Sequence, residues 1–439
     1  MKSFTKFDTI KLGLTMFALF FGAGNMIFPP LLGQQAGTQT WITLAGFLIT
    51  GVGLPYLGVV AVTMSGNQLS DLASKASPLF AMIFPLIVYL SIGPFFGMPR
   101  TATVSFEIAV SPFVPASAET LALAIFSITF FAITIWLALK PNKIVDRFGS
   151  ILTPALLAIV TLIIVTGIIK PVGQAGPAME PFTEAPFAKG FIEGYGTMDA
   201  IAALVFAIIV INAVKAKGIT DRKAITSITM KAGTIAVVGL SLVYAGLAYL
   251  GSTSRIVAEG ADNGGDILAK LAYALMGNSG LYLLGLAVTL ACLTTAVGLV
   301  SASSTYLSKM IPGISYKMLV FVICTFTTIV ANIGLTKLLE ITLPVLIGVY
   351  PLAIVLISFR LFHPLFKGYH EVYILGLLAA GIIGFFDLLS AFKINLGPVT
   401  YFLKFLPLYE QGLGWIIPAL VFGLIGFIVA YAQRKPLVE

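Results

Sequence analysis

The feature that most constrains this chain is a series of apolar segments, each about twenty residues long, with the charged residues confined to short stretches between them. A helix of that length crosses the hydrocarbon core of a bilayer, about 30 Å, at about 1.5 Å per residue. The segments are continuously apolar rather than alternating, which favours helices over the strands of a membrane barrel. We therefore predict an all-α polytopic membrane protein with about twelve transmembrane helices. The segments fall roughly at 9–33, 40–64, 79–105, 120–139, 149–169, 188–214, 225–251, 280–308, 315–336, 338–361, 371–391 and 412–432.

Composition excludes a soluble fold. Hydrophobic residues make up 58% of the 439 residues, charged residues make up 10%, and the mean hydropathy is +1.02. The net charge of +8 does not indicate nucleic-acid binding, because no stripe of Lys and Arg with interleaved aromatic residues lies outside the predicted loops. We predict a single transmembrane domain over 1–432 and a short cytoplasmic tail at 433–439.

The distribution of Lys and Arg predicts the orientation. If the chain crosses the membrane twelve times, most of these residues fall in loops on the same side as the N-terminus. Cytoplasmic loops carry such an excess of positive charge. We therefore expect a multi-pass membrane protein with both termini in the cytoplasm.

Two of the predicted spans are interrupted in a matching way. The first contains Phe21-Gly22-Ala23-Gly24-Asn25 followed by Pro29-Pro30, and the sixth begins with Gly194-Tyr195-Gly196-Thr197-Met198-Asp199. The sixth span comes five spans after the first, and because five is odd, a second set that starts there runs through the membrane in the opposite direction to the first. This is the inverted-repeat plan of many secondary transporters, in which broken helices at corresponding positions mark a binding site near the midplane. Repeat one covers about 9–169, repeat two about 188–361, and the last two helices, at about 371–432, lie outside the repeat.

Unwound backbone at membrane depth needs partners that lipid cannot supply. The N–H groups of the half-helix that follows such a break favour an anion, and the carbonyls of the half-helix before it favour a cation. A zwitterionic amino acid with a coupling cation fits both. The alternative for either stretch alone is that its glycines only let helices pack closely.

Three polar side chains inside apolar segments are candidates for function. Asp199 is costly at membrane depth, so it could contact a cation or the substrate amine, or it could pair structurally with a donor such as Arg100. Thr294 and Thr295 offer hydroxyl oxygens suited to Na+, although such hydroxyls also bond to the preceding helical turn.

Enzymatic motifs are missing from the sequence. There is no P-loop, nucleophile elbow or H-E-x-x-H helix, and no His/Cys/carboxylate cluster accompanies His363 and His370. Cys292 and Cys324 lie within apolar segments and do not form a redox motif. We expect no enzyme and no organic cofactor.

Four motifs together resemble a known family, the bacterial branched-chain amino acid:cation symporters, or BrnQ-type carriers. They are Leu19-Phe20-Phe21-Gly22-Ala23-Gly24-Asn25-Met26-Ile27-Phe28-Pro29-Pro30, Ile92-Gly93-Pro94 with Pro99-Arg100-Thr101-Ala102, Gly194-Tyr195-Gly196-Thr197-Met198-Asp199 and Cys292-Leu293-Thr294-Thr295-Ala296. The likeness covers essentially the whole chain. It implies a fold similar to that of LeuT, with a 5+5 inverted repeat, broken helices 1 and 6, and two further helices.

The resemblance also implies site residues. The N–H groups of Ala23 and Gly24 would hold the substrate carboxylate. The substrate site as a whole would comprise Ala23, Gly24, Asn25, Gly194, Tyr195, Gly196, Thr197 and Asp199. One Na+ would be held by Ala18, Phe21, Ala291, Thr294 and Thr295, and a second Na+ site would lie near Phe20, Asn25 and Thr197. The stretch Met26-Ile27-Phe28 lacks the Arg that helps to close the outer gate of the neurotransmitter-type relatives, and whether Arg100 replaces it stays open.

The resemblance implies import of Leu, Ile and Val together with Na+ across a bacterial inner membrane, and we expect no nucleic acid and no obligatory protein partner. A carrier of another apolar amino acid coupled to H+ is the alternative, which Asp199 could support. A channel is a further alternative, but its continuous polar stripe is absent, because the polar residues concentrate at two breaks and one hydroxyl cluster.

Overall fold

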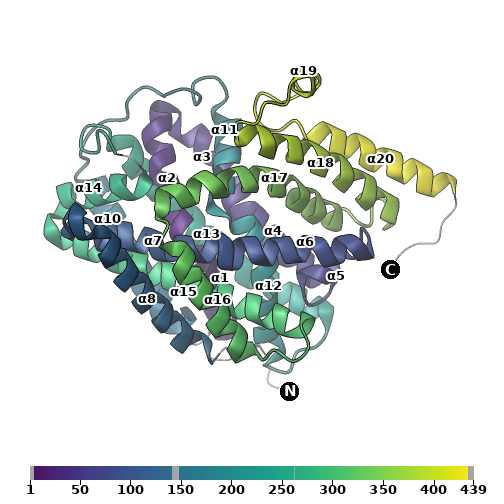
Figure 1. Cartoon of the computed structure of the whole chain (residues 1–439), viewed down its shortest axis with the longest axis horizontal. Coiled ribbons are helices and arrows are strands. Elements are labelled where there is room, and N and C mark those ends of the chain that lie inside the picture. The colour runs from purple at the N-terminus through teal and green to yellow at the C-terminus, as the bar shows by residue number, and fades with distance from the viewer. Residues whose placement is uncertain (1–3, 141–147, 262, 434–439) are drawn as a thin grey trace.

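A computed structural model describes residues 4–140, 148–261 and 263–433, and this part of the chain is helical without a strand. Of the predicted tail, only Gln433 lies within the described residues. Figure 1 shows α1 (Lys6–Phe20), α12 (Asp199–Lys215) and α13 (Arg222–Thr253) near the centre of the molecule, with α18 (His370–Ala391) and α20 (Ile416–Ala432) along one side.

The first predicted break is confirmed. α1 begins at a capping box between Thr5 and Asp8 and ends at Phe20. Gly22 is extended, with φ −119° and ψ −151°, and α2 (Ala23–Ala36) starts directly after it. The N–H groups in the first turn of α2 have no helical carbonyls before them, so this end of the helix can receive an anion.

The sixth span is also broken. α11 (Pro186–Glu193) continues into the 3-10 turn η8 (Gly194–Thr197), and Met198 takes a left-handed conformation with φ 67° before α12 begins. The axis bends by 44° here. A left-handed residue other than glycine is uncommon, so surrounding contacts must hold this turn in place.

Spans two and three contain irregular turns that the sequence did not predict. They are the π-turn η2 (Ile49–Gly53), between α3 (Thr40–Leu48) and α4 (Leu54–Ser65), and the π-turn η3 (Ser91–Phe95), between α6 (Pro78–Leu90) and α7 (Gly97–Ala109). The remaining helices and 3-10 or π-turns are η1 (Gly37–Gln39), α5 (Leu69–Ala73), η4 (Ser111–Phe113), η5 (Ala116–Ala118), α8 (Glu119–Ala138), η7 (Phe148–Leu152), α10 (Thr153–Ile169), α14 (Gly264–Met276), α15 (Asn278–Met310), α16 (Tyr316–Ala331), α17 (Leu335–Leu361) and α19 (Pro398–Leu403).

The structure shows that the membrane crossings are helical, but it does not fix their number at twelve. Among the described residues, eight helical units are long and apolar enough to cross a membrane, or nine if the bent pair α11 and α12 counts as one. α16 and α20 are shorter apolar helices, and Ala23–Ser65 runs on as a single unit of 43 residues. The multi-pass membrane architecture is confirmed, whereas the number twelve and the boundaries of the two repeats stay predictions.

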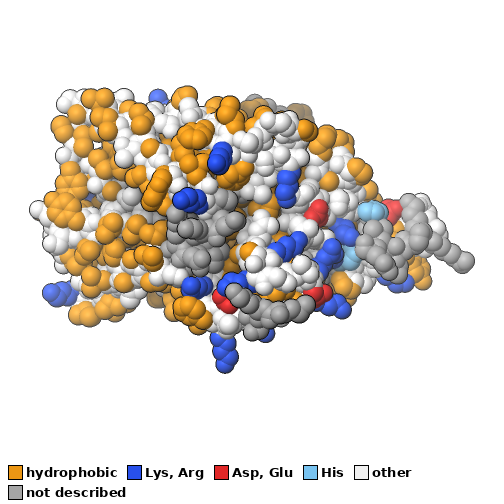
Figure 2. Space-filling model, turned by 90° about the horizontal axis from the view of Figure 1, so that it is seen from below, with side chains coloured by type: hydrophobic (Ala, Val, Ile, Leu, Met, Phe, Trp, Pro, Cys, Tyr) orange, Lys and Arg blue, Asp and Glu red, His pale blue; other side chains and the backbone are white. Residues whose placement is uncertain are grey.

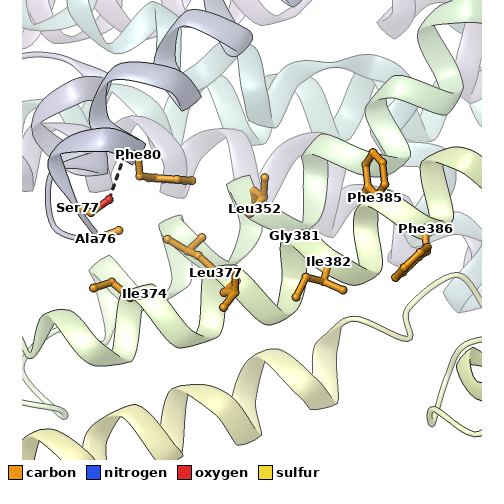
Figure 3. A pocket seen from close by; sticks show the side chains of 11 residues that line it. Ala76, Ser77, Phe80, Leu352, Ile374, Leu377, Gly381, Ile382, Phe385 and Phe386 are labelled. Carbon is orange, nitrogen blue, oxygen red and sulfur yellow. Dashed lines mark hydrogen bonds between the residues drawn. The ribbon is translucent and has the colours of Figure 1, made fainter.

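The outer surface suits hydrocarbon. Large apolar side chains point outward along whole helices, such as Leu121, Ile125 and Ile128 on α8. Figure 2, seen from below the view of Figure 1, shows hydrophobic side chains over much of the surface. A groove of about 500 Å³ between α6, α17 and α18 is lined almost entirely by apolar residues, among them Phe80, Leu377 and Phe385 (Figure 3). Because Ser77 is the one polar side chain in its lining, the groove suits lipid chains rather than an amino acid.

Candidate substrate and ion site

The two breaks lie against each other in the interior. A Cβ atom added to Gly24 would stand 2.8 Å from Nη2 of Arg100 and 3.0 Å from the Cα atom of Thr197. A Cβ on Gly196 would stand 2.5 Å from the ring of Phe28. The glycines therefore allow close packing, which was the alternative to a role in binding. The segments that they bring together are the two pieces of unwound backbone.

Asn25 joins the first break to the sixth span. Its side-chain oxygen accepts the N–H of Gly22 at 3.0 Å, and its amide nitrogen donates to Oδ2 of Asp199 and to the hydroxyl of Tyr244. Asn25 and Asp199 are almost fully buried, with exposures of 1% and 3%. Two side chains predicted for the site therefore meet, 174 residues apart in the sequence.

Asp199 is the centre of this cluster. Tyr244 donates its hydroxyl to Oδ2 of Asp199 at 3.2 Å, and the backbone N–H of Asp199 donates to the Thr197 hydroxyl at 3.2 Å. Tyr244, on α13, was missed by the sequence analysis. It is one hydroxyl in a long apolar segment, and only its position on the buried face of α13, with Leu240 and Leu247, distinguishes it.

Arg100 holds the sixth-span break. Its two terminal nitrogens donate to the carbonyls of Gly196 and Thr197 at 2.7 and 3.0 Å. In the part of the chain that the structure describes, no ion pair joins it to Asp199, so the pairing considered from the sequence is not made directly. A bidentate guanidinium satisfies two carbonyls that the irregular turn leaves without helical partners.

The candidate cation site lies where α15 passes α1. The Thr294 hydroxyl lies 3.1 Å from the carbonyl of Ala18 and 2.8 Å from that of Ala291, and the Thr295 hydroxyl lies 3.4 Å from Ala18 and 3.2 Å from Leu19. Four of the five predicted ligands thus come together. The carbonyl of Leu19 contacts Thr295 where that of Phe21 was expected, because α1 stays helical through Phe20 and the chain turns away at Phe21, with ψ 82°. All these donors are hard oxygens, which suit Na+.

A small cavity connects these groups. It is lined by residues of both breaks, by Arg100 and Thr295, and by apolar side chains that include Phe20, Phe206 and Leu299. Its volume is about 30 Å³, room for a water or two. An amino acid would require these apolar side chains to move apart.

The predicted substrate residues divide into two sets. Ala23, Gly24, Asn25, Thr197 and Asp199 line the cavity, and so does Phe20 of the predicted second cation site.

The other three predicted substrate residues lie behind the cavity wall; they are Gly194, Tyr195 and Gly196. A Cβ on Gly194 would meet the Thr50 hydroxyl at 2.0 Å, the ring of Tyr195 stacks on Tyr350 with centroids 4.2 Å apart, and the carbonyl of Gly196 is held by Arg100. The turn η8 directs these residues toward neighbouring helices, so they support the wall of the cavity and do not line it. Among the described residues, no group of three or more His, Cys, Asp or Glu could hold a transition metal.

The sequence profile described as branched-chain amino acid transport protein matches residues 5–433. The chain belongs to this family. Family members include the branched-chain amino acid permease BraB of Bacillus subtilis, which is 46% identical over 96% of this chain and 95% of its own length. The branched-chain amino acid transport system 2 carrier protein of Pseudomonas aeruginosa is 43% identical over 98% of both chains, and the permease BrnQ of Escherichia coli K12 is 38% identical over 96% and 95%. These relatives are permeases and carriers, so this is a family of transporters and not of enzymes.

Two solved structures share the fold of this chain. MhsT in complex with L-phenylalanine aligns over 97% of this chain and 98% of its own, with a TM-score of 0.59 and 12% identity. Mhp1, a nucleobase-cation-symport-1 family transporter in a closed conformation, aligns over 98% and 94%, with a TM-score of 0.63 and 15% identity. At such low identity they show the fold alone, and the predicted LeuT-like fold is confirmed.

Proposed function

We propose that this protein imports Leu, Ile and Val into the bacterial cell together with Na+ by alternating access. One observation carries the proposal: the unwound backbone of spans one and six meets at a buried cavity next to a cluster of hard oxygen atoms. The relatives named above are branched-chain amino acid permeases or carriers, which supports the substrate class.

The substrate would bind by both of its charged ends. The first N–H groups of α2, at Ala23 and Gly24, would receive the carboxylate. The amine would lie toward Asp199 and the carbonyls of the sixth-span break. The apolar wall of Phe20, Phe206 and Leu299 would receive the branched side chain. A methylene in such a wall is worth only about 1 to 3 kcal/mol, so one carrier should serve all three amino acids.

Sodium would bind between α1 and α15. The hydroxyls of Thr294 and Thr295 now donate to the carbonyls of Ala18, Leu19 and Ala291. By rotating, they would turn their lone pairs toward an ion shared with those carbonyls. A second ion near Phe20, Asn25 and Thr197 is part of the same proposal. Its position beside the cavity would let substrate and ion stabilise each other.

The energy available from one ion is sufficient for accumulation. One Na+ moving through about 100 mV yields roughly 2.3 kcal/mol. A tenfold Na+ gradient adds about 1.4 kcal/mol. Together they could concentrate the substrate on the order of 500-fold.

Alternating access requires the side that we assign to the cytoplasm to open and close. There Lys217, after α12, pairs with Asp8 of α1 at 2.9 Å, and Lys215 donates to Asn67 at 2.5 Å. The first contact ties the first half of span one to the end of span six, and the second ties that same end to the segment after α4. Opening toward the cytoplasm would break them.

Coupling to H+ is the second candidate, and the buried carboxylate of Asp199 is the observation that favours it. The deciding experiment is uptake of labelled leucine into proteoliposomes with a single gradient imposed at a time. The proposal predicts accumulation with an inward Na+ gradient and little with a pH gradient alone. Accumulation driven by the pH gradient without Na+ would instead establish the H+-coupled alternative.

A further inference from the structure

A second large groove combines an apolar wall with a positive rim. It has a volume of about 780 Å³ and lies where the ends of α4 and α17 meet the beginning of α13. Its wall is formed by side chains such as Tyr56, Val60, Met64 and Met230. The four cations around it are Arg222, Lys223, Lys231 and Arg360. By contrast, the groove in Figure 3 has no charged residue in its lining.

The three cations on α13 are exposed, and all of them line the groove. Lys231 lies nine residues, or two and a half turns, after Arg222. The positive charges therefore extend over roughly 13 Å along the helix axis, from its first residue into the apolar part. Long basic side chains at such positions place their stems on apolar surface and their charges toward the interface.

In the part of the chain that the structure describes, no acid forms an ion pair with these cations. Ion pairs there join Lys189 to Glu193, Lys217 to Asp8 and Lys270 to Asp266, and none includes a groove cation.

The nearest acid in the sequence, Asp221, is used elsewhere. Its carboxylate accepts the backbone N–H of Ala224 at 2.8 Å and so caps α13. Arg360 donates to the Ser65 hydroxyl at 2.8 Å and to the carbonyl of Met64, so it holds α17 to the end of α4 without losing its charge.

The excess positive charge of the groove affects Lys75, in the loop before α6. Burial lowers the pKa of Lys75, and the positive charges of Arg360 and Arg222 lower it further. A site that repels a lysine in this way attracts anions. In Figure 2, Lys and Arg side chains gather over the middle and right of the face shown, with few acidic side chains among them.

We propose that this groove binds an anionic phospholipid of the cytoplasmic leaflet. Arg222, Lys223 and Lys231 hold the phosphate of the headgroup, with Arg360 at the edge, and an acyl chain lies along Tyr56, Val60 and Met64. Basic pockets between helices at the cytoplasmic side suit such headgroups, and the apolar wall distinguishes a lipid from a free anion. A hydrophobic groove without cations would not select among phospholipids.

The position of the groove connects lipid binding to transport. α13 packs against both halves of the first span, α1 and α2, and α4 packs against α12. A lipid that bridges α13 and α17 would therefore connect α17 to a helix that packs directly against the broken first span. Its binding should change the rate of transport without changing which ion is coupled.

The test compares lipid binding to the purified full-length protein by native mass spectrometry. The groove variant is Arg222→Gln/Lys223→Gln/Lys231→Gln. The matched control, Lys140→Gln/Lys309→Gln/Lys317→Gln, removes three exposed cations elsewhere on the side that we assign to the cytoplasm. The wild type and the control should retain phosphatidylglycerol over phosphatidylcholine, and the groove variant should lose at least about tenfold in phosphatidylglycerol affinity.

Competition identifies the source of the anion. Inorganic phosphate in excess should displace little phosphatidylglycerol, because it cannot fill the apolar wall. In vesicles, mixing phosphatidylglycerol into phosphatidylcholine should speed leucine uptake by the wild type and the control but not by the groove variant.

Three results would overturn the proposal: equal phosphatidylglycerol binding by the groove variant, equal binding of the two lipids by the wild type, or ready displacement by phosphate. Leucine binding by each variant in detergent shows that it is folded. None of these outcomes depends on whether Na+ or H+ drives transport, so failure here is distinct from failure of the proposed coupling.

Discussion

At the scale of single residues, the centre of the molecule is a chain of hydrogen bonds from Gly22 through Asn25 to Asp199 and Tyr244. Each member is buried, so an unpaired group here would cost about 1 to 3 kcal/mol. The cluster therefore fixes how the first break meets the sixth span. It also keeps a carboxylate beside the cavity.

Tyr244→Phe tests whether this cluster serves transport. The change removes one hydroxyl and leaves the ring in place. Asp199 then loses a hydrogen bond to a charged group, worth about 1.5 to 3 kcal/mol, and Asn25 loses a neutral one, worth about 0.5 to 1.5 kcal/mol. We expect leucine uptake to fall about tenfold or more while the amount of inserted protein is unchanged. Tyr249→Phe, on the same helix but outside the cluster, is the control and should transport normally. Normal uptake by Tyr244→Phe would mean that the hydroxyl has no part in the site.

Gly24→Ala tests the contact between the breaks. Its methyl group would stand 2.8 Å from Nη2 of Arg100 and 3.0 Å from the Cα atom of Thr197, both tightly held. Overpacking of this kind costs about 1 to 3 kcal/mol. We expect uptake assays to show a loss of leucine transport. Gly53→Ala, where the new Cβ would have its nearest neighbour at 3.7 Å, should be active. An active Gly24→Ala protein would contradict the close contact.

At the scale of elements, the sequence predicted both breaks because two glycine-containing stretches occupy matching positions in spans one and six, although either stretch alone also fitted close helix packing. It also predicted the pair Thr294 and Thr295, since adjacent hydroxyls are conspicuous in a membrane helix. The π-turns η2 and η3 were not predicted, because π-turns arise from tertiary packing rather than from a residue pattern. The role of Arg100 depends on three-dimensional contacts and could only be posed as a question.

The contact of Arg100 with the sixth-span break can be tested by substitution. Arg100→Lys keeps a charge but cannot donate to the carbonyls of Gly196 and Thr197 in the same bidentate way. At least one buried carbonyl then loses its partner, at a cost of about 1 to 3 kcal/mol. We expect a lower thermal midpoint in detergent and weaker leucine binding.

Arg255→Lys is the control for this substitution, because Arg255 is half-buried and donates to the single carbonyl of Gln34 at 3.3 Å. It should change both measurements less. If Arg100→Lys and Arg255→Lys behave alike, Arg100 does not hold the sixth-span break.

At the scale of the whole molecule, the ion pair between Asp8 and Lys217 joins the two broken spans on the side that we assign to the cytoplasm. It is partly exposed, and such pairs contribute about 0.2 to 1 kcal/mol. Lys217→Gln should therefore shift the population toward molecules open on this side by up to about fivefold.

The shift can be measured by alkylation of a cysteine placed at Ser304, which is buried on α15. Both native cysteines, Cys292 and Cys324, are buried and provide a low background. Alkylation should be faster with Lys217→Gln and unchanged with Lys309→Gln. An unchanged rate with Lys217→Gln would show that the pair does not restrain opening.

Transport as proposed requires that the two breaks and the hydroxyls of α15 act as one site for an amino acid and its ion. The most direct measurement is binding of labelled leucine to purified protein as Na+ is varied, for the wild type and for Thr294→Ala/Thr295→Ala. The control is Thr327→Ala/Thr328→Ala, an adjacent pair on α16 whose hydroxyls donate to the carbonyls of Ile323 and Cys324 of their own helix. We predict that Na+ strengthens leucine binding to the wild type and the control, and that this dependence disappears in the Thr294/Thr295 variant. Undiminished dependence on Na+ in that variant would contradict the account.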